Sequence, residues 1–454
     1  MISDASKTPP TRLRALAARL RLILGIDLHI LQTLLLRGWS VIAGGVMVLF
    51  VPHWFDRVDQ GYFYTFNSLI AIQIFFELGM NQVVVQIVSH EAAHLRGQPD
   101  GSFTGARASI TRLASLARLL TRWYRVAALL FFVCGGVAGA IFFDAWNGHG
   151  RETAIWMVLV LFTAVNLYVS PALAMLEGMG QVGAVARVRL MQSIAGYLLM
   201  WAALSLGAGL AVAPVLAGTG AVYSCYWLAR RDRRIRWLRA TDIAAADDVL
   251  SWRHDVFPFQ WRIALSWMSG YLILQLLVPL AFSRQGAVAA GQLGLTLTIY
   301  NSLLSIGLSW VNARLPVMAG QIARDERAGA RATFRGVVMR STVITLLGSV
   351  TVMAAIALMP EFMRVRFADI PTIACLALAT TANCVIYALA TFARAHREEP
   401  LLVQSIGTAI LMVPTLYLAS GVGIFAMAAV FAVVIVIFSL PWVALVFRRY
   451  YNRV

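Results

Sequence analysis

The chain contains few charged residues and few cysteines for its length. Only 13% of its 454 residues are charged, against 60% that are hydrophobic, and Lys7 is the single lysine. A soluble protein of this size could not bury so much apolar surface, so the composition excludes the soluble class and predicts a chain embedded in a bilayer. The four cysteines fall within apolar runs without metal-ligand spacing and are interpreted as small packing residues: Cys134, Cys225, Cys375 and Cys384.

The features of an enzyme are also missing. No nucleophile, phosphate-binding loop or pair of carboxylates forms a catalytic constellation in the sequence. The loops expected outside the membrane have roughly a dozen residues or fewer, which is too short for a folded catalytic domain. We therefore expect no enzymatic activity, no catalytic residues, no cofactor and no metal. The polar and then basic first residues also lack the apolar run of a cleavable signal peptide.

What the sequence does contain is a series of long apolar runs. A helix needs about 20 apolar residues to cross the ~30 Å hydrocarbon core of a bilayer, and about twelve runs have that length. The expected fold class is therefore all-α, a polytopic membrane protein of about twelve transmembrane helices. The expected spans are residues 34–55, 61–88, 126–146, 153–176, 188–207, 209–229, 258–281, 287–315, 337–359, 371–393, 400–420 and 422–446.

Arginines gather in alternate loops of this expected topology. Arginine-rich stretches occur at the N-terminus, after the second span, around residues 230–239 and 324–335, and in the tail, whereas the intervening loops carry little net positive charge. The positive-inside rule then places both termini in the cytoplasm. The net charge of +17 is spread over every cytoplasmic loop, so we assign it to contact with anionic lipids rather than to nucleic acid.

Composition also divides the chain into four parts. Residues 1–33 are a basic arm, whose stretch 11–22 is typical of an amphipathic helix lying on the membrane; a solvated arm is the alternative. Residues 34–229 form a first lobe of six spans and residues 256–454 a second one. Residues 230–255 form a cytoplasmic linker between them, basic at first and then acidic.

The two lobes are related by an internal repeat. Gln60-Gly61 recurs as Gln285-Gly286 at an offset of 225, and each pair follows a Val-Pro dipeptide. With an even number of spans in each half, both copies insert in the same orientation and are related by a pseudo-twofold axis along the membrane normal. Transporters built from repeats have their substrate path between the copies. We therefore expect a central cavity between the lobes.

Three arginines near the cytoplasmic ends of expected spans are candidate ligands for a diphosphate. Arg37 and Arg262 also lie 225 positions apart, near the starts of the first and seventh spans. A single arginine at such a place would be explained by a side chain that extends to the lipid headgroups. Recurrence at the offset of the repeat instead favours a pair that faces the seam, where two guanidinium groups suit bidentate capture of a diphosphate. Arg314 is a third candidate, with extension to the headgroups as its alternative.

Glu77 is the acidic residue deepest in the expected spans, and Asn81 follows it by one helical turn. Burial favours the protonated form of a carboxyl group, so Glu77 is the candidate for proton or ion coupling, with Asn81 beside it. The alternative is a structural role, in which Arg37 or Asn81 is the partner of Glu77 and fixes helix packing. Trp39 and Trp310 are candidates for stacking on sugars, although aromatic residues near membrane interfaces more commonly pack.

One motif indicates a different chemistry. His90-Glu91-Ala92-Ala93-His94 matches the H-E-x-x-H pattern, in which two histidines on a helix bind zinc and the glutamate is the general base. The motif lies at the cytoplasmic end of an expected span and is followed by a basic linker, which leaves no room for a protease cleft. A polar helix end is the preferred interpretation, and a membrane zinc metallopeptidase is the distant alternative.

Several stretches resemble one family of membrane proteins. Asp59-Gln60-Gly61-Tyr62 and its continuation through Glu77-Leu78-Gly79-Met80 are similar to the first signature of bacterial polysaccharide flippases. These are Wzx-type members of the multidrug/oligosaccharidyl-lipid/polysaccharide exporter (MOP) superfamily. Residues 176–183 and 393–400 are similar to that family's connections between the fourth and fifth and between the tenth and eleventh spans. The resemblance covers essentially the whole chain.

The resemblance implies two six-helix lobes around a cavity, alternating access, and transfer of undecaprenyl-diphosphate-linked sugars from the cytoplasmic to the periplasmic leaflet. Lipid II flippase relatives use cavity arginines in their first and seventh helices, which are the helices of Arg37 and Arg262. Glu77 stands where the family often has aspartate before Leu-Gly.

The expected function is thus that of a flippase in the bacterial inner membrane. Its expected substrate is a lipid-linked oligosaccharide, such as an O-antigen or capsule repeat unit, used in cell-surface polysaccharide biosynthesis. Anionic lipids, the polysaccharide polymerase and the chain-length machinery are further expected partners, and nucleic acid is not. The alternative within transporters is a multidrug or small-molecule antiporter of the same superfamily, which would transport organic cations.

Overall fold

The computed structural model of the chain describes residues 28–98, 100–144, 150–230, 232–241, 250, 252, 256–324, 326–394 and 401–451. Most of the predicted arm and part of the predicted linker, residues 231, 242–249, 251 and 253–255, lie outside the described residues.

The first half of the chain begins with α2 (Leu28–Trp54) and a broken span. That span consists of α3 (Arg57–Ile70), the 3-10 turn η1 (Ala71–Gln73), α4 (Ile74–Glu77) and α5 (Met80–Ala92), and a hairpin of β1 (Leu95–Gly97) and β2 (Phe103–Gly105) follows. The remaining elements are α6 (Arg107–Leu130), the π-helical turn η2 (Phe131–Gly135), α7 (Gly136–Asp144), α8 (Arg151–Gly178), α9 (Val182–Ser205), η3 (Gly209–Val212), α10 (Val215–Arg230) and α11 (Arg234–Ala240).

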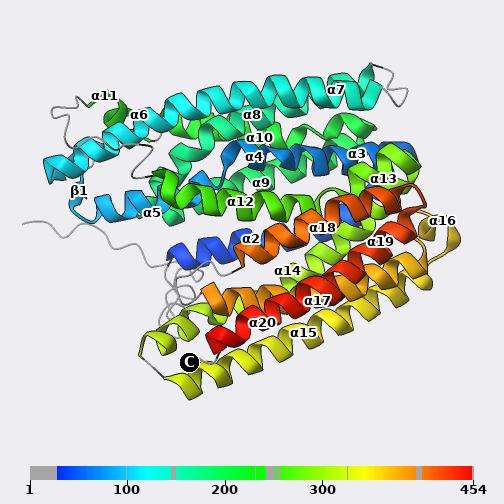
Figure 1. Cartoon of the computed structure of the whole chain (residues 1–454). Coiled ribbons are helices and arrows are strands. Elements are labelled where there is room, and N and C mark those ends of the chain that lie inside the picture. Colours follow the sequence, from blue (N-terminus) through cyan, green and yellow to red (C-terminus); the bar gives the residue numbers. More distant parts are fainter. Residues whose placement is uncertain are drawn as a thin grey trace, which may run out of the picture.

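The second half contains longer helices. It comprises α12 (Phe257–Leu274), α13 (Leu277–Gln285), α14 (Ala287–Ala323), α15 (Arg327–Ala357), the short α16 (Glu361–Arg364), α17 (Ile370–Arg394), α18 (Leu402–Ser420), α19 (Ile424–Val433), the π-helical η6 (Val434–Ser439) and α20 (Leu440–Tyr451). Helices α6, α8 and α10 lie on one side of the bundle and α15, α17 and α20 on the other (Figure 1). The two halves of the sequence therefore also separate in space.

The all-α polytopic fold class is confirmed. Among the described residues, eight helical segments are long and apolar enough to cross a membrane, and two further bent pairs of helices raise the number to ten. Each of the twelve expected spans falls on a helix or a bent helix pair. The number of twelve crossings and the cytoplasmic location of both termini remain predictions.

The bundle has two distinct ends. The hairpin, α11 and the C-terminus lie at one end, here called the basic end, and the first turns of α3, the last turn of α13 and α16 lie at the other, here called the far end (Figure 1). The positive-inside rule would place the basic end in the cytoplasm.

The structure corrects the expected helix boundaries at the basic end. Helix α6 begins at Arg107, well before the expected span at residue 126, and a hairpin and α11 occupy stretches expected to be loop. The early part of α6 is amphipathic: Leu113, Leu116 and Leu120 are at most 1% exposed, while arginines occupy the other face. Hydropathy averaged along the chain misses such a helix, because the average combines the two faces.

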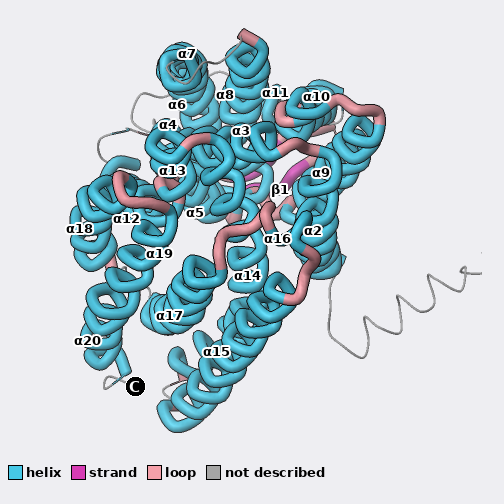
Figure 2. Tube along the Cα trace, turned by 90° about the vertical axis from the view of Figure 1, so that its right-hand side faces the viewer, coloured by secondary structure: helices cyan, strands magenta, loops and turns pink. Residues whose placement is uncertain are grey.

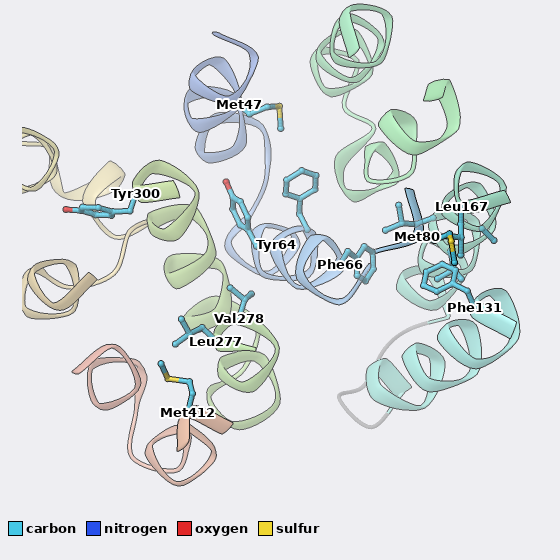
Figure 3. Close-up of a cluster of buried hydrophobic side chains, with 14 of the residues drawn as sticks. Met47, Tyr64, Phe66, Met80, Phe131, Leu167, Leu277, Val278, Tyr300 and Met412 are labelled. Carbon is cyan, nitrogen blue, oxygen red and sulfur yellow. The ribbon is translucent and has the colours of Figure 1, made fainter. Parts of the chain in front are cut away.

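The buried side chains form one large cluster that extends through both halves of the chain. Tyr64 and Phe66 of α3 lie in its middle, between Leu277 and Tyr300 of the second half and Leu167 of the first (Figure 3). Since lipid tails are as apolar as these side chains, close packing rather than exclusion of water holds such helices together. Helix α3 packs against helices α13 and α14 of the second half as well as against α8 of its own half.

Candidate functional site

The two halves meet along a seam formed by α2, α3, α4, α5, α12, α13 and α14. Helix α14 lies in the middle of the bundle (Figure 2), next to α2 and α3 of the first half and α15 and α17 of the second. Both bent spans belong to this seam: they bend by 44° and 40°, and α12 contacts α4 and α5 while α13 contacts α3. The two broken spans therefore pack against each other across the seam.

The seam is tightly closed at the far end. A Cβ atom on Gly61 of α3 would lie 1.9 Å from the carbonyl oxygen of Ala287, and one on Gly294 would lie 2.4 Å from Tyr64. The buried side chain of Gln60 donates two hydrogen bonds across the seam, to the carbonyl oxygens of Gly291 (2.9 Å) and Arg366 (3.0 Å). We call this set of interactions the far-end contact. Only glycine allows two helix backbones to approach so closely.

The same helix is exposed toward the basic end. In the far half of α14, Ala290, Leu293 and Leu295 are fully buried, whereas Ile306 is 37% and Trp310 is 41% exposed in its basic half. Because α14 lies in the middle of the bundle, this difference along one helix indicates that the halves pack closely at the far end and less closely at the basic end. We call this less tightly packed part of the seam its open half.

The three predicted arginines lie in this basic half. Helical rise places Arg262 about 8 Å from the start of α12, and Arg37 and Arg314 about 14 Å from the basic ends of α2 and α14. The side chains of Arg262 and Arg314 are exposed and have no salt-bridge partner among the described residues, and the Arg37 side chain lies outside the described residues. The Arg262 guanidinium carbon lies 5.4 Å from the ring centroid of Trp261.

Glu77 lies at the break in the second span. Leu78 and Gly79 both adopt left-handed backbone conformations, at φ 51° and 64°, which end α4 and start α5. A left-handed residue other than glycine costs roughly 1–2 kcal/mol, so Leu78 is held there by its surroundings. A Cβ on Gly79 would lie 2.5 Å from Cγ2 of Ile263, so the break packs directly against α12 beside Arg262.

Several helices supply polar partners to Glu77. Asn81 donates a hydrogen bond from Nδ2 to Glu77 Oε1, and the charge of Arg189 on α9 acts on the same carboxyl group. Arg189 also forms a salt bridge with Glu177 of α8, at 3.0 Å. Tyr124 of α6, which is fully buried, interacts electrostatically with Glu77. The result is a polar cluster of five residues inside the first lobe, here called the Glu77 cluster.

The sequence predicted part of this cluster. The structural alternative for Glu77 gave Arg37 or Asn81 as its partner; the structure pairs it with Asn81, and the Arg37 side chain lies outside the described residues. Arg189 was not among the predicted site residues. The available signal was the glycine after Glu77-Leu78, since glycine inside an apolar run can mark an interruption of a helix.

The two predicted tryptophans have different environments. The Trp39 indole donates a hydrogen bond to Ser193 Oγ (3.1 Å) and its ring lies 6.1 Å from that of Trp201, so it packs between α2 and α9. Trp310 is exposed on the basic half of α14, four residues before Arg314. The arrangement brings Trp310 and Arg314 onto neighbouring positions of one helix face and leaves Trp39 in contact with α9.

The H-E-x-x-H stretch does not form a continuous helix. Helix α5 ends at Ala92, so His94 lies in the following turn. Glu91 is buried and forms a salt bridge with Arg112 of α6 at 3.1 Å. The part of the chain that the structure describes contains no group of three or more potential metal ligands. Glu91 thus joins α5 to α6, as expected for a polar helix end.

The chain is similar in fold to proteins of known structure. No protein-family model matches the chain, and no curated protein matches it. Solved structures do match: the MATE multidrug transporter DinF-BH has a TM-score of 0.59 and 14% identity, over 93% of this chain and 95% of that one. Lipid II flippase MurJ in an inward closed conformation has a TM-score of 0.59 and 10% identity, over 92% and 87%. The eukaryotic MATE transporter AtDTX14 has a TM-score of 0.55 and 14% identity, over 93% and 100%.

The chain therefore has the fold that MATE transporters and the lipid II flippase MurJ share. The match extends over nearly the whole length of both partners in each comparison, so it includes both halves of the chain. Sequence identities of 10% to 14% establish that the fold is similar and no more than that.

Proposed function

We propose that this chain is a membrane transporter that flips an undecaprenyl-diphosphate-linked oligosaccharide from the cytoplasmic to the periplasmic leaflet of the bacterial inner membrane. The observation that carries the proposal is the pair of exposed arginines Arg262 and Arg314, which have no salt-bridge partner among the described residues and lie on two helices of the seam, in its open half. Arg37 occupies a similar depth on α2. A diphosphate needs several guanidinium donors, and the loading side is where it would first arrive.

The fold supports a transport function in general, and export of multiple drugs is the second candidate function. DinF-BH is a multidrug transporter, and its similarity to this chain equals that of MurJ by TM-score. A multidrug exporter needs an apolar or acidic cavity for organic cations, whereas cationic side chains at the open end of the seam repel them. The arginines therefore favour an anionic substrate over a cationic drug.

A genetic experiment tests the proposal. Deletion of the gene should cause a lipid-linked glycan to accumulate on the cytoplasmic side of the membrane, and the wild-type gene should reverse it. Complementation by Arg262→Ala and by Arg37→Ala should fall about tenfold or more, because each removes a charge-assisted, bidentate contact with the diphosphate. Arg364→Ala, at an exposed arginine of the far end, is the matched control.

Full complementation by both Arg37→Ala and Arg262→Ala, at normal protein levels, would refute the arginine site. If deletion causes no accumulation but does impair export of an organic cation such as ethidium, the chain is a multidrug exporter instead.

A further inference from the structure

A pocket lies at the far end, away from the predicted arginines. It has a volume of about 730 Å³ and lies between the last turns of α2 and the segment that follows α15. Phe50, His53 and Trp54 line it from the first half, and Phe362 and Arg366 from the second. Because its walls come from both halves, any movement of the halves relative to each other changes its shape.

Arg366 supplies a cationic group that has unused hydrogen-bonding capacity. Its Nη1 atom is buried and has no hydrogen-bond partner among the described residues. Burial and the neighbouring Arg57 lower the pKa of this guanidinium, and Asp56 opposes them in part. Arginine keeps its proton at physiological pH, so a partly buried positive charge remains that an anion would stabilise.

Apart from Arg366 and His53, the residues that line the pocket are apolar, and several of them are exposed. Leu49 is 63% and Phe362 is 73% exposed, and Trp54 is 40% exposed at the end of its helix. Aromatic residues at the end of a membrane helix lie at the level of the lipid headgroups, where their rings contact both headgroup and chain. A cationic group at that level, between helices and beside apolar walls, suits a lipid whose headgroup carries phosphate.

We infer that this far-end pocket binds the phosphate of an anionic lipid through Arg366, with the hydrocarbon chain against Leu49, Phe50 and Phe362. The phosphate has two sources: an anionic phospholipid of that leaflet, or an isoprenyl phosphate that has crossed the membrane. A soluble anion would not use the apolar walls.

The far-end contact gives the bound lipid an effect on conformation. Gln60 of α3 holds the carbonyl oxygen of Arg366, and Gln292 of α14 holds that of Val365, both at 3.0 Å. The backbone that carries the phosphate ligand is thus tied to both halves. A lipid bound at Arg366 stabilises the closed far end, because opening would separate Arg366 from the α2 wall of the pocket.

Thermal unfolding of the purified protein in neutral detergent tests the inference. Phosphatidylglycerol should raise the unfolding temperature more than phosphatidylcholine does, and undecaprenyl phosphate should be compared with both. Arg366→Gln should weaken the apparent affinity for the anionic lipid about tenfold, because one charge-assisted interaction is lost. Arg364→Gln, an exposed arginine two residues away, should leave it unchanged.

The lipid that stabilises the protein against thermal unfolding identifies the source of the phosphate. Stabilisation by phosphatidylglycerol alone assigns a phospholipid, and stabilisation by undecaprenyl phosphate assigns an isoprenyl chain. The inference is overturned if Arg366→Gln leaves the preference for anionic lipid intact, or if inorganic phosphate stabilises the protein as strongly as the lipid. If Arg366→Gln does not fold, stabilisation by anionic and by neutral lipid is compared instead in His53→Gln and in Trp54→Ala, which are both at exposed positions.

Discussion

At the scale of single residues, three carboxylates in the helices of the first lobe have partners from a neighbouring helix. Glu77 has Asn81, Glu177 has Arg189, and Glu91 has its arginine on α6. An isolated charge in hydrocarbon is costly, so pairing is the condition for keeping it there. Glu77 differs from the other two, because its hydrogen-bond donor is a neutral amide and its backbone neighbours are left-handed.

Glu77→Gln should abolish the response of transport to a proton gradient, if Glu77 is the coupling group. Glutamine keeps an oxygen that can accept the hydrogen bond from Asn81, so the fold should be preserved while the titratable group is lost. Flipping assayed in proteoliposomes with and without a pH gradient provides the measurement.

Glu91→Gln on the same broken span is the control, since Glu91 joins α5 to α6 at the basic end. A gradient response that survives in Glu77→Gln would leave Glu77 with a structural role only.

At the scale of elements, the two copies of the repeat use the same dipeptide differently. Gln60 bonds across the seam to α14, and Gly61 brings α3 against Ala287. Gln285 instead donates to the carbonyl oxygen of Ser420 within the second half, at 2.7 Å. Equal sequence signals thus produce an inter-lobe contact in one copy and an intra-lobe contact in the other.

Gly61→Ala should weaken the far-end contact, because the new Cβ would lie 1.9 Å from the Ala287 carbonyl oxygen. Overpacking of this kind typically costs about 1–3 kcal/mol, which corresponds to a roughly 5- to 150-fold shift toward states with an open far end. The measurement is thiol labelling at Thr296→Cys, a fully buried position of α14, after replacement of the native cysteines.

Gly45→Ala on α2, where a Cβ would have no neighbour within 4 Å, is the matched control and should leave labelling unchanged. Equal labelling in the Gly61 and Gly45 variants would show that the glycine contact does not hold the far end closed.

At the scale of the whole molecule, the chain is closed at one end of its seam and open at the other. Its fold is shared with the MATE transporter DinF-BH and with MurJ. Burial along α14 follows the same direction, because Ile306 and Trp310 in its basic half are exposed, although Val311 and Met318 there remain buried. The described arrangement is therefore less tightly packed toward the basic end than at the far end.

Sided labelling should reveal this arrangement in membranes. A cysteine at Ser309, exposed in the basic half of α14, should react with a membrane-impermeant thiol reagent in inside-out vesicles and stay protected in right-side-out vesicles. A cysteine at Thr296 should be protected from both sides. Labelling of Ser309→Cys only in right-side-out vesicles would reverse the predicted orientation.

Much of the fold follows from hydropathy, and much of the site does not. Runs of apolar residues locate every long helix, since a spanning helix must satisfy its own backbone and face lipid. The extension of α6 is missed because its apolar residues occupy one face, and Arg189 is missed because its partner Glu177 is on another helix. Glu77 was found because a charge in an apolar run is conspicuous in any chain, while its environment depends on four helices.

By itself, the sequence determined the fold class, the spans, the repeat and the candidates Arg37, Arg262 and Glu77, because each depends on composition or spacing along the chain. Only the tertiary structure decided which end of the seam is closed, that Gln60 and not Gln285 bridges the halves, and that Arg366 lines a pocket with α2. Those properties depend on contacts between residues far apart in the chain, and helix packing in a membrane is governed by fit rather than by hydropathy.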